Sequence, residues 1–254
     1  MKVTIIGGGG RVGSNAAFAL QCAGIIAEIQ ILDANTDLAE GEALDLLHGT
    51  SSVADQKIYS GDYNRARDSD IFIITAGLRR KPDESRLDLI NRNVSLFSQI
   101  LVDIRQTDIK EEAIVFIVSN PVDVLTHLAA TSLSLPWKQV FGLGTMLDTA
   151  RFRSLIAEEL QLGPTQVKAL ILGEHGDSMV PITRLATIGG IPAEELIPKN
   201  RLDAIVDRVR YAGGEIVKLF GNGSAYYAPA ASAIEMAESY LRDKKRIIPS
   251  AALC

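Results

Sequence analysis

Short apolar runs alternate with longer segments of helical periodicity through the first half of the chain. The apolar runs predict strands at residues 2–6, 28–33, 70–76, 113–119 and 139–144. The longer segments predict helices over residues 11–22, 38–49 and 87–106, with another that starts near residue 121. A regular alternation of strands and helices favours a parallel sheet with helices on both faces. The pattern therefore predicts an α/β fold.

The pattern changes near Leu147. Helical segments lengthen, notably over residues 201–220 and 224–241, and apolar runs become sparse. This change predicts a second, α+β unit, so we expect two domains, residues 1–146 and 147–254. Neither a flexible linker nor an internal repeat or low-complexity tract separates them.

Composition excludes several classes of protein. Acidic residues outnumber basic ones by 31 to 26, and the chain has no long Lys/Arg tract, so nucleic acid is a poor partner. No stretch reaches the roughly 20 apolar residues of a membrane helix. Cys22 and Cys254 form no CxxC pair, which favours neither a disulfide framework nor a cysteine metal site. Because the chain also enters a strand directly, we expect a cytoplasmic protein, and no metal site is evident.

A glycine cluster after the first apolar run is the first chemical motif. It fits G-x-G-x-x-G through Gly8, Gly10, Arg11, Val12 and Gly13, and fits G-x-x-G-x-x-G equally well. Such a turn lets a pyrophosphate approach the positive end of the following helix, although many strand-helix turns resemble it. Asp33, 20 residues after Gly13, ends the next apolar run. A carboxylate there binds ribose hydroxyls and repels a 2′-phosphate, which favours NAD over NADP.

His175 differs from the other two histidines in its setting. It follows the apolar run 166–172 and sits between glycines, whereas His48 and His127 lie in helical segments. A histidine at a strand end suits proton transfer. Asp148 offers a carboxylate to hold the ring, and Arg151 shares its helix face. Helical periodicity does not bring residues 148 and 175 together. An ordinary surface ion pair is therefore as good an interpretation of Asp148 as a pairing with His175.

A basic run follows the strand predicted at residues 70–76. Arg79, Arg80 and Lys81 are consecutive, and Arg86 comes one helical turn further along. The run fits either a solvated turn or an anion-binding loop. Residues alone leave both open.

Taken together, these motifs resemble the NAD-dependent lactate/malate dehydrogenase family. Besides the glycine loop and Asp33, the chain carries in family order TAGLRRKPDESRLDL, VSNPVD, LDTARFR, LGEHGDSMVP and GSAYYAPA. The resemblance covers residues 1–254. It implies a Rossmann domain with a doubly wound parallel sheet, an α+β substrate domain, and hydride transfer between a nicotinamide and a 2-hydroxy acid.

The resemblance also implies a role for each site residue. His175 is expected to be the proton donor and acceptor, and Asp148 the carboxylate that orients it. Arg151 would bind the substrate carboxylate, Arg86 would polarise the carbonyl, and Asn120 would hydrogen-bond near the reacting oxygen. The expected NAD-binding residues are Gly8, Gly10, Arg11, Val12, Gly13, Asp33, Thr75, Ala76, Gly77, Asn93, Val118 and Asn120.

Substrate choice rests mainly on Arg80. In the family this position is typically arginine in malate dehydrogenases and glutamine in lactate dehydrogenases, on a loop that closes over substrate. A second arginine suits the second carboxylate of oxaloacetate. Gly223 also resembles the malate branch. We therefore expect malate and oxaloacetate as substrates, with lactate and pyruvate as the alternative, and keep a solvated turn for Arg79 and Lys81.

The sequence departs from the family pattern in two ways. Asp83 stands where a glycine is common, and the chain ends at RIIPSAALC, where members continue. We therefore expect the C-terminal part of the substrate domain to be missing, and a non-catalytic NAD-binding or assembly module becomes a third hypothesis. The intact catalytic set argues against that module. A homodimer or homotetramer is the expected assembly.

Overall fold

The computed structural model describes residues 1–78 and 85–253, and its largest element is a seven-stranded sheet. The strand order is β12-β6-β5-β4-β1-β2-β3, in which only β12 is antiparallel to its neighbour. The order reverses between β1 and β4, so their carboxyl ends open a crevice of the kind that binds nucleotides. The strands are β1 (Lys2–Ile6), β2 (Glu28–Leu32), β3 (Lys57–Ser60), β4 (Ile71–Ile74), β5 (Ile114–Ile117), β6 (Val140–Gly142) and β12 (Ala251–Ala252).

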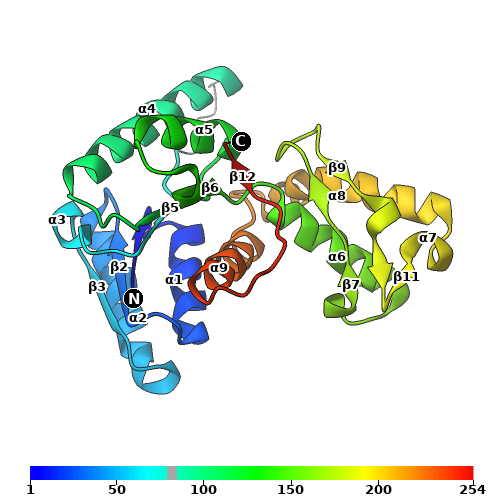
Figure 1. Cartoon of the computed structure of the whole chain (residues 1–254), viewed down its shortest axis with the longest axis horizontal. Coiled ribbons are helices and arrows are strands. Elements are labelled where there is room, and N and C mark those ends of the chain that lie inside the picture. Colours follow the sequence, from blue (N-terminus) through cyan, green and yellow to red (C-terminus); the bar gives the residue numbers. More distant parts are fainter. Residues whose placement is uncertain (79–84, 254) are drawn as a thin grey trace.

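Helices cover both faces of this sheet, as the apolar strands require. The strands β4 and β5 are buried at every position. Figure 1 shows α4 and α5 on one side of the sheet, and α1 beside α9 on the other. The helices around the sheet are α1 (Arg11–Ala23), α2 (Thr36–Val53), α3 (Tyr63–Ala66), α4 (Arg86–Gln106), α5 (Val122–Ser132) and α9 (Tyr227–Leu241). Among the residues described, no helix is long and apolar enough to cross a membrane.

Local sequence signals explain where several helices begin and end. Asn35 caps α2 by accepting a hydrogen bond from the Leu38 N–H at 3.1 Å. Ser85 caps α4 in the same way through the Asp88 N–H. Gly24 ends α1 with φ 63°, a left-handed conformation that glycine adopts without a Cβ clash.

A second hydrophobic cluster forms beyond the main sheet, with Phe152 fully buried inside it. Figure 1 shows this region beside the sheet region. It contains α6 (Met146–Leu160), α7 (Ala193–Leu196), α8 (Lys199–Phe220), β7 (Val167–Lys168), β8 (Ile171–Leu172), β9 (Val180–Pro181), β10 (Thr187–Ile188) and β11 (Ile191–Pro192). Short 3-10 helices occur at Trp137–Gln139, Pro164–Gln166 and Thr183–Leu185.

The segment 166–172 was expected as one strand, and the structure divides it. Val167–Lys168 pairs with β10, whereas Ile171–Leu172 pairs with β9 in a different sheet. Each half pairs with a different strand, and a run of apolar residues does not specify its pairing partner. His175 nevertheless follows a strand, as predicted.

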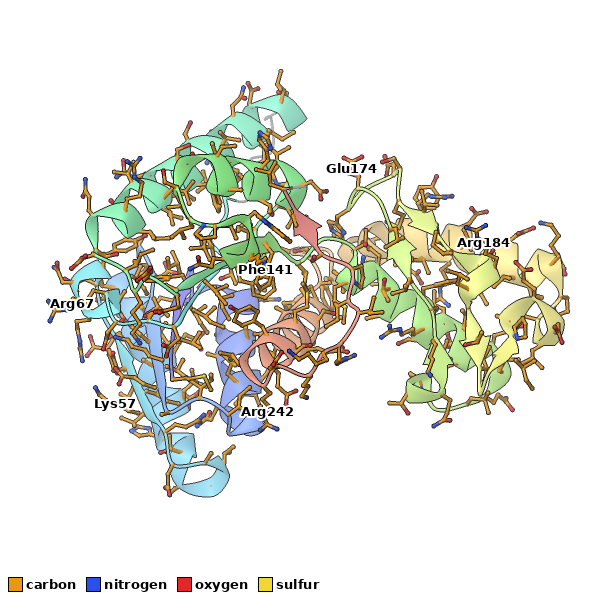
Figure 2. The ribbon with its side chains drawn as sticks, in the orientation of Figure 1. Lys57, Arg67, Phe141, Glu174, Arg184 and Arg242 are labelled. Carbon is orange, nitrogen blue, oxygen red and sulfur yellow. The ribbon has the colours of Figure 1, made fainter. Side chains whose placement is uncertain are left out.

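The last part of the chain returns to the first core. Ala233 and Met236 of α9 belong to the hydrophobic cluster of the main sheet. Phe141 of β6, labelled in Figure 2, has its ring centroid 6.2 Å from that of Tyr240. In addition, β12 pairs with β6. Elements within residues 227–252 therefore pack against residues 2–142. The domain division at residue 147 stays a prediction.

Candidate active site

The glycine loop brings α1 very close to β1. Gly7 has φ +85°, and a Cβ added at Gly13 would lie 2.4 Å from the Gly7 carbonyl oxygen. No residue with a side chain fits there without movement. Gly10 precedes α1 without a side-chain cap, so the first-turn N–H groups, which have no acceptor within the helix, face outward as donors for an anion.

Asp33 lies beside this loop at the end of β2. Its Oδ2 accepts the Gly9 N–H at 3.1 Å, and its Oδ1 accepts the Asn35 N–H at 3.0 Å. Two backbone donors therefore fix the carboxylate next to the predicted pyrophosphate site. The arrangement fits an adenosine ribose, whose hydroxyls would donate to the remaining lone pairs.

The segment after β4 forms the other wall of the crevice. Thr75 donates its hydroxyl to the Gly7 carbonyl at 3.1 Å, and a Cβ at Gly7 would lie 2.4 Å from the Ala76 nitrogen. Asn93 accepts the Leu78 N–H at 2.8 Å and donates to the Leu89 carbonyl. Both ends of the Asn93 amide are thus engaged within the protein, so here it braces the turn that carries Gly77.

Asp148, His175 and Arg151 meet at one buried carboxylate. Asp148 on α6 is fully buried, and its Oδ2 lies 2.6 Å from His175 Nδ1. Its Oδ1 accepts from Arg151 Nη1 at 3.1 Å. An ionised carboxylate only accepts, so Nδ1 carries the proton and Nε2 of the neutral ring is free to act as a base. The surface ion pair is excluded, because neither Asp148 nor Arg151 is exposed.

Asp123 is a contact that the sequence analysis missed. Its Oδ2 accepts the backbone N–H of His175 at 2.9 Å, across 52 residues of chain. Asp123 belongs to the first turn of α5, within the same VSNPVD motif as Asn120. Figure 2 labels Glu174, the residue before His175, on the loop that lies between the two regions. Only the fold brings this loop onto α5, and a motif by itself does not predict the pairing.

A cavity of about 90 Å³ joins the glycine loop to His175. Asn120 lines it and also accepts the Val122 N–H at 3.3 Å. The other lining residues are Val12, Val118, Val122, Leu143, Gly144, Leu147, Ser224, Ala225 and Pro229. Three predicted cofactor residues, Val12, Val118 and Asn120, therefore border one space with His175. In the described part of the chain, no three His, Cys, Asp or Glu side chains are arranged to hold a metal.

Two predicted substrate-binding side chains, those of Arg80 and Arg86, lie outside the part of the protein that the structure describes. Arg80 belongs to residues 79–84, which the structure does not describe, and Arg79, Lys81 and Asp83 belong there as well. Arg86 begins α4, but its side chain is likewise outside the described atoms. Their roles stay predictions.

Comparison with known proteins identifies the family. The family model of the lactate/malate dehydrogenase NAD binding domain matches residues 1–142. The family model of the α/β C-terminal domain matches residues 145–253. The chain belongs to the lactate/malate dehydrogenase family. It is therefore an NAD-dependent 2-hydroxy acid dehydrogenase by family, which confirms the predicted class and cofactor.

Individual relatives agree with this assignment. The malate dehydrogenase of Chlorobium limicola is 44% identical over 251 residues, which are 98% of this chain and 80% of the relative. The apo malate dehydrogenase of Picrophilus torridus has a TM-score of 0.95 at 38% identity, covering 100% of this chain and 79% of the other. The minor L-lactate dehydrogenase of Enterococcus mundtii has a TM-score of 0.94 at 36% identity, covering 100% and 81%.

These matches also bear on the expected fold. The Rossmann-like parallel sheet with a C-terminal α/β domain is confirmed. The expectation that part of the substrate domain is missing is not confirmed, because the C-terminal family model matches residues 145–253. Sequence reasoning judged that domain by the length of family members, whereas the residues present form its core around Phe152.

Proposed function

We propose that this protein interconverts malate and oxaloacetate with NAD. The observation that carries the proposal is the buried Asp148 carboxylate, which binds both His175 Nδ1 and Arg151 Nη1. One carboxylate thereby orients a proton carrier and a cation that suits a substrate carboxylate. Relatives named malate dehydrogenase, 40–44% identical over nearly the whole chain, support this substrate pair.

The residues of the crevice fit NAD. The glycine loop would receive the pyrophosphate, Asp33 the adenosine ribose, and the Thr75–Gly77 turn would border the dinucleotide. A Cβ at Gly13 would lie 2.7 Å from the Gly8 Cα, so glycine there lets α1 pack closely against the loop that would receive the pyrophosphate. Bound there, NAD would supply the nicotinamide that exchanges a hydride with the substrate carbon. Asn120 and Val118, which line the cavity, are the proposed neighbours of that ring.

His175 is the proposed acid and base. Asp148 accepts the hydrogen bond from His175 Nδ1, which leaves Nε2 for the substrate oxygen. When malate is oxidised, Nε2 accepts the hydroxyl proton. When oxaloacetate is reduced, the ring returns that proton to the new hydroxyl oxygen. The anionic Asp148 stabilises the charged ring between these two steps.

Arg151 is the proposed anchor of the substrate carboxylate. Its side chain is 14% exposed, and in the described part of the chain its buried Nε has no hydrogen-bond partner. A buried donor without a partner is costly, and a carboxylate would satisfy it. Family resemblance assigns Arg86 to the reacting carbonyl.

Arg80 is the proposed specificity residue, and it supplies the test. NADH oxidation should be faster with oxaloacetate than with pyruvate. Replacing Arg80→Gln removes a charge-assisted contact to the second carboxylate, so kcat/KM for oxaloacetate should fall roughly 10²- to 10³-fold. Pyruvate should improve, because no unpaired charge is then enclosed.

Arg79→Gln is the matched control, because it removes the same charge from the neighbouring residue expected to be solvated. An oxaloacetate-to-pyruvate ratio that Arg80→Gln leaves unchanged would exclude Arg80 as the selector. A wild-type preference for pyruvate would favour lactate as the substrate instead. That alternative has support from the similar solved lactate dehydrogenases.

Three further proposals accompany this function. Residues 1–146 would form the NAD-binding domain and residues 147–254 the substrate domain. The protein would act in the cytoplasm, and it would assemble as a homodimer or homotetramer, as family resemblance implies. Light scattering of the purified protein tests the assembly directly.

A further inference from the structure

Arg11 makes a contact that the cofactor motif does not explain. It is the first residue of α1, and its guanidinium carbon lies 5.1 Å from the ring centroid of Tyr226. Its Nη1 lies 4.0 Å from the place a Cβ would take at Gly223. The side chain therefore reaches from the glycine loop to the segment 223–226, which is far away in sequence.

The contact leaves the hydrogen-bonding edge of the guanidinium free. An aromatic face attracts a cation without using its N–H donors. Among the residues described, Arg11 forms no ion pair with a carboxylate, although the chain has a net charge of −5. A free arginine fork at the start of α1 thus lies beside the N–H donors that face the predicted pyrophosphate.

Tyr226 is well fixed for holding Arg11. It precedes α9, and its ring stacks on Phe220 at a centroid distance of 5.8 Å and contacts Tyr227 at 4.3 Å. Its neighbours Ser224 and Ala225 line the cavity that contains His175. The ring therefore presents a fixed face to Arg11 from the residue that follows the cavity-lining pair Ser224 and Ala225.

We propose that Arg11 binds the cofactor pyrophosphate through its side chain, and that Tyr226 is a positioning residue which holds the guanidinium for that contact. The inference rests on the proposed function and adds a side-chain contact to the backbone contacts of the glycine loop. Arginine pairs with two phosphate oxygens through parallel N–H groups. The stack on Tyr226 reduces the rotamer freedom that this pairing would otherwise remove.

NADH titration followed by fluorescence tests the proposal without turnover. Arg11→Gln should weaken NADH binding about 10- to 30-fold, because a charged contact to phosphate is lost. Tyr226→Leu should weaken it about three- to tenfold, whereas Tyr226→Phe keeps the ring face and should stay within about twofold. The double variant should bind NADH no more weakly than Arg11→Gln does, since Tyr226 acts through Arg11.

Two controls locate the effect. Arg184→Gln removes the same charge from an exposed residue of the second region, away from the sheet region (Figure 2), and NADH affinity should not change. In competition with NADH, Arg11→Gln should weaken ADP but leave adenosine, which has no phosphate, unaffected.

Wild-type NADH affinity in Arg11→Gln, or an equal loss of adenosine, would overturn the phosphate contact. Equal weakening by Tyr226→Leu in the wild-type and Arg11→Gln backgrounds would overturn the positioning role. Because Arg11 is exposed, its variant does not depend on refolding of a core. A wild-type protein that binds NADH and reduces oxaloacetate while Arg11→Gln behaves normally would sink this inference alone. Failure of the wild type to bind NADH would sink the proposed function.

Discussion

The cofactor crevice and the His175 centre are built in different ways. The crevice is formed mainly by backbone groups of the β1–loop–α1 unit, and the Gly9 and Asn35 N–H groups hold Asp33, the residue after the next strand. The His175 centre is formed by groups of separate elements, since Asp123 on α5 lies 52 residues before His175 and Asp148 on α6 lies 27 residues before it. A spacing rule can therefore specify the crevice. Tertiary packing has to assemble the catalytic centre.

The largest expected effect separates these two regions. His175→Asn keeps hydrogen bonding but cannot carry a proton, so kcat should fall on the order of 10³-fold. NADH binding should change by less than about twofold, because His175 makes none of the proposed pyrophosphate and ribose contacts. Stopped-flow reduction of oxaloacetate and NADH titration measure the two quantities.

His127→Asn is the matched control, since His127 is exposed on α5 and outside the cavity. It should leave kcat unchanged. Near-wild-type turnover of His175→Asn, with the chemical step shown to limit the rate, would remove His175 from the mechanism and break the comparison.

The sequence predicted the first half of the fold well, because its signals are local. Residues 2–6 form β1 as predicted, and the helix expected over residues 87–106 is α4 with one more residue at its start. Burial on both faces makes such strands continuously apolar and easy to recognise. The second half was less predictable, because β7 to β12 are two residues each and depend on their partners.

The candidate site divides along the same line. Residue spacing indicated the glycine loop and Asp33, but it left the pairing of Asp148 with His175 open, and it missed Asp123. An aspartate in the first turn of a helix is also a common helix-stabilising residue, so its presence in the sequence does not indicate that it binds the His175 loop. That role follows from the distance to the His175 N–H.

The second prediction tests the crevice alone. Asp33→Asn keeps an acceptor for the Gly9 N–H but removes the charge that meets a 2′-phosphate. The ratio of NADH to NADPH affinity should fall roughly 10- to 100-fold, mainly through better NADPH binding. Fluorescence titration with both cofactors measures it, and Asp37→Asn, an exposed residue in the first turn of α2, is the control. Equal affinities for the two cofactors in the wild type would contradict the role of Asp33.

The smallest expected effect concerns Asp123, which links the sheet region to the catalytic loop. Asp123→Ala removes the acceptor for the His175 N–H, and kcat should fall about tenfold as the ring loses its fixed position. Asp123→Asn retains an oxygen acceptor and should recover most of that loss. Removing a first-turn carboxylate also costs α5 about 0.3–1 kcal/mol, which both variants share. Stability therefore does not distinguish the variants, and kcat does. If Asp123→Asn is as slow as Asp123→Ala, the charge of Asp123 matters rather than its hydrogen bond, and the loop is held by other contacts.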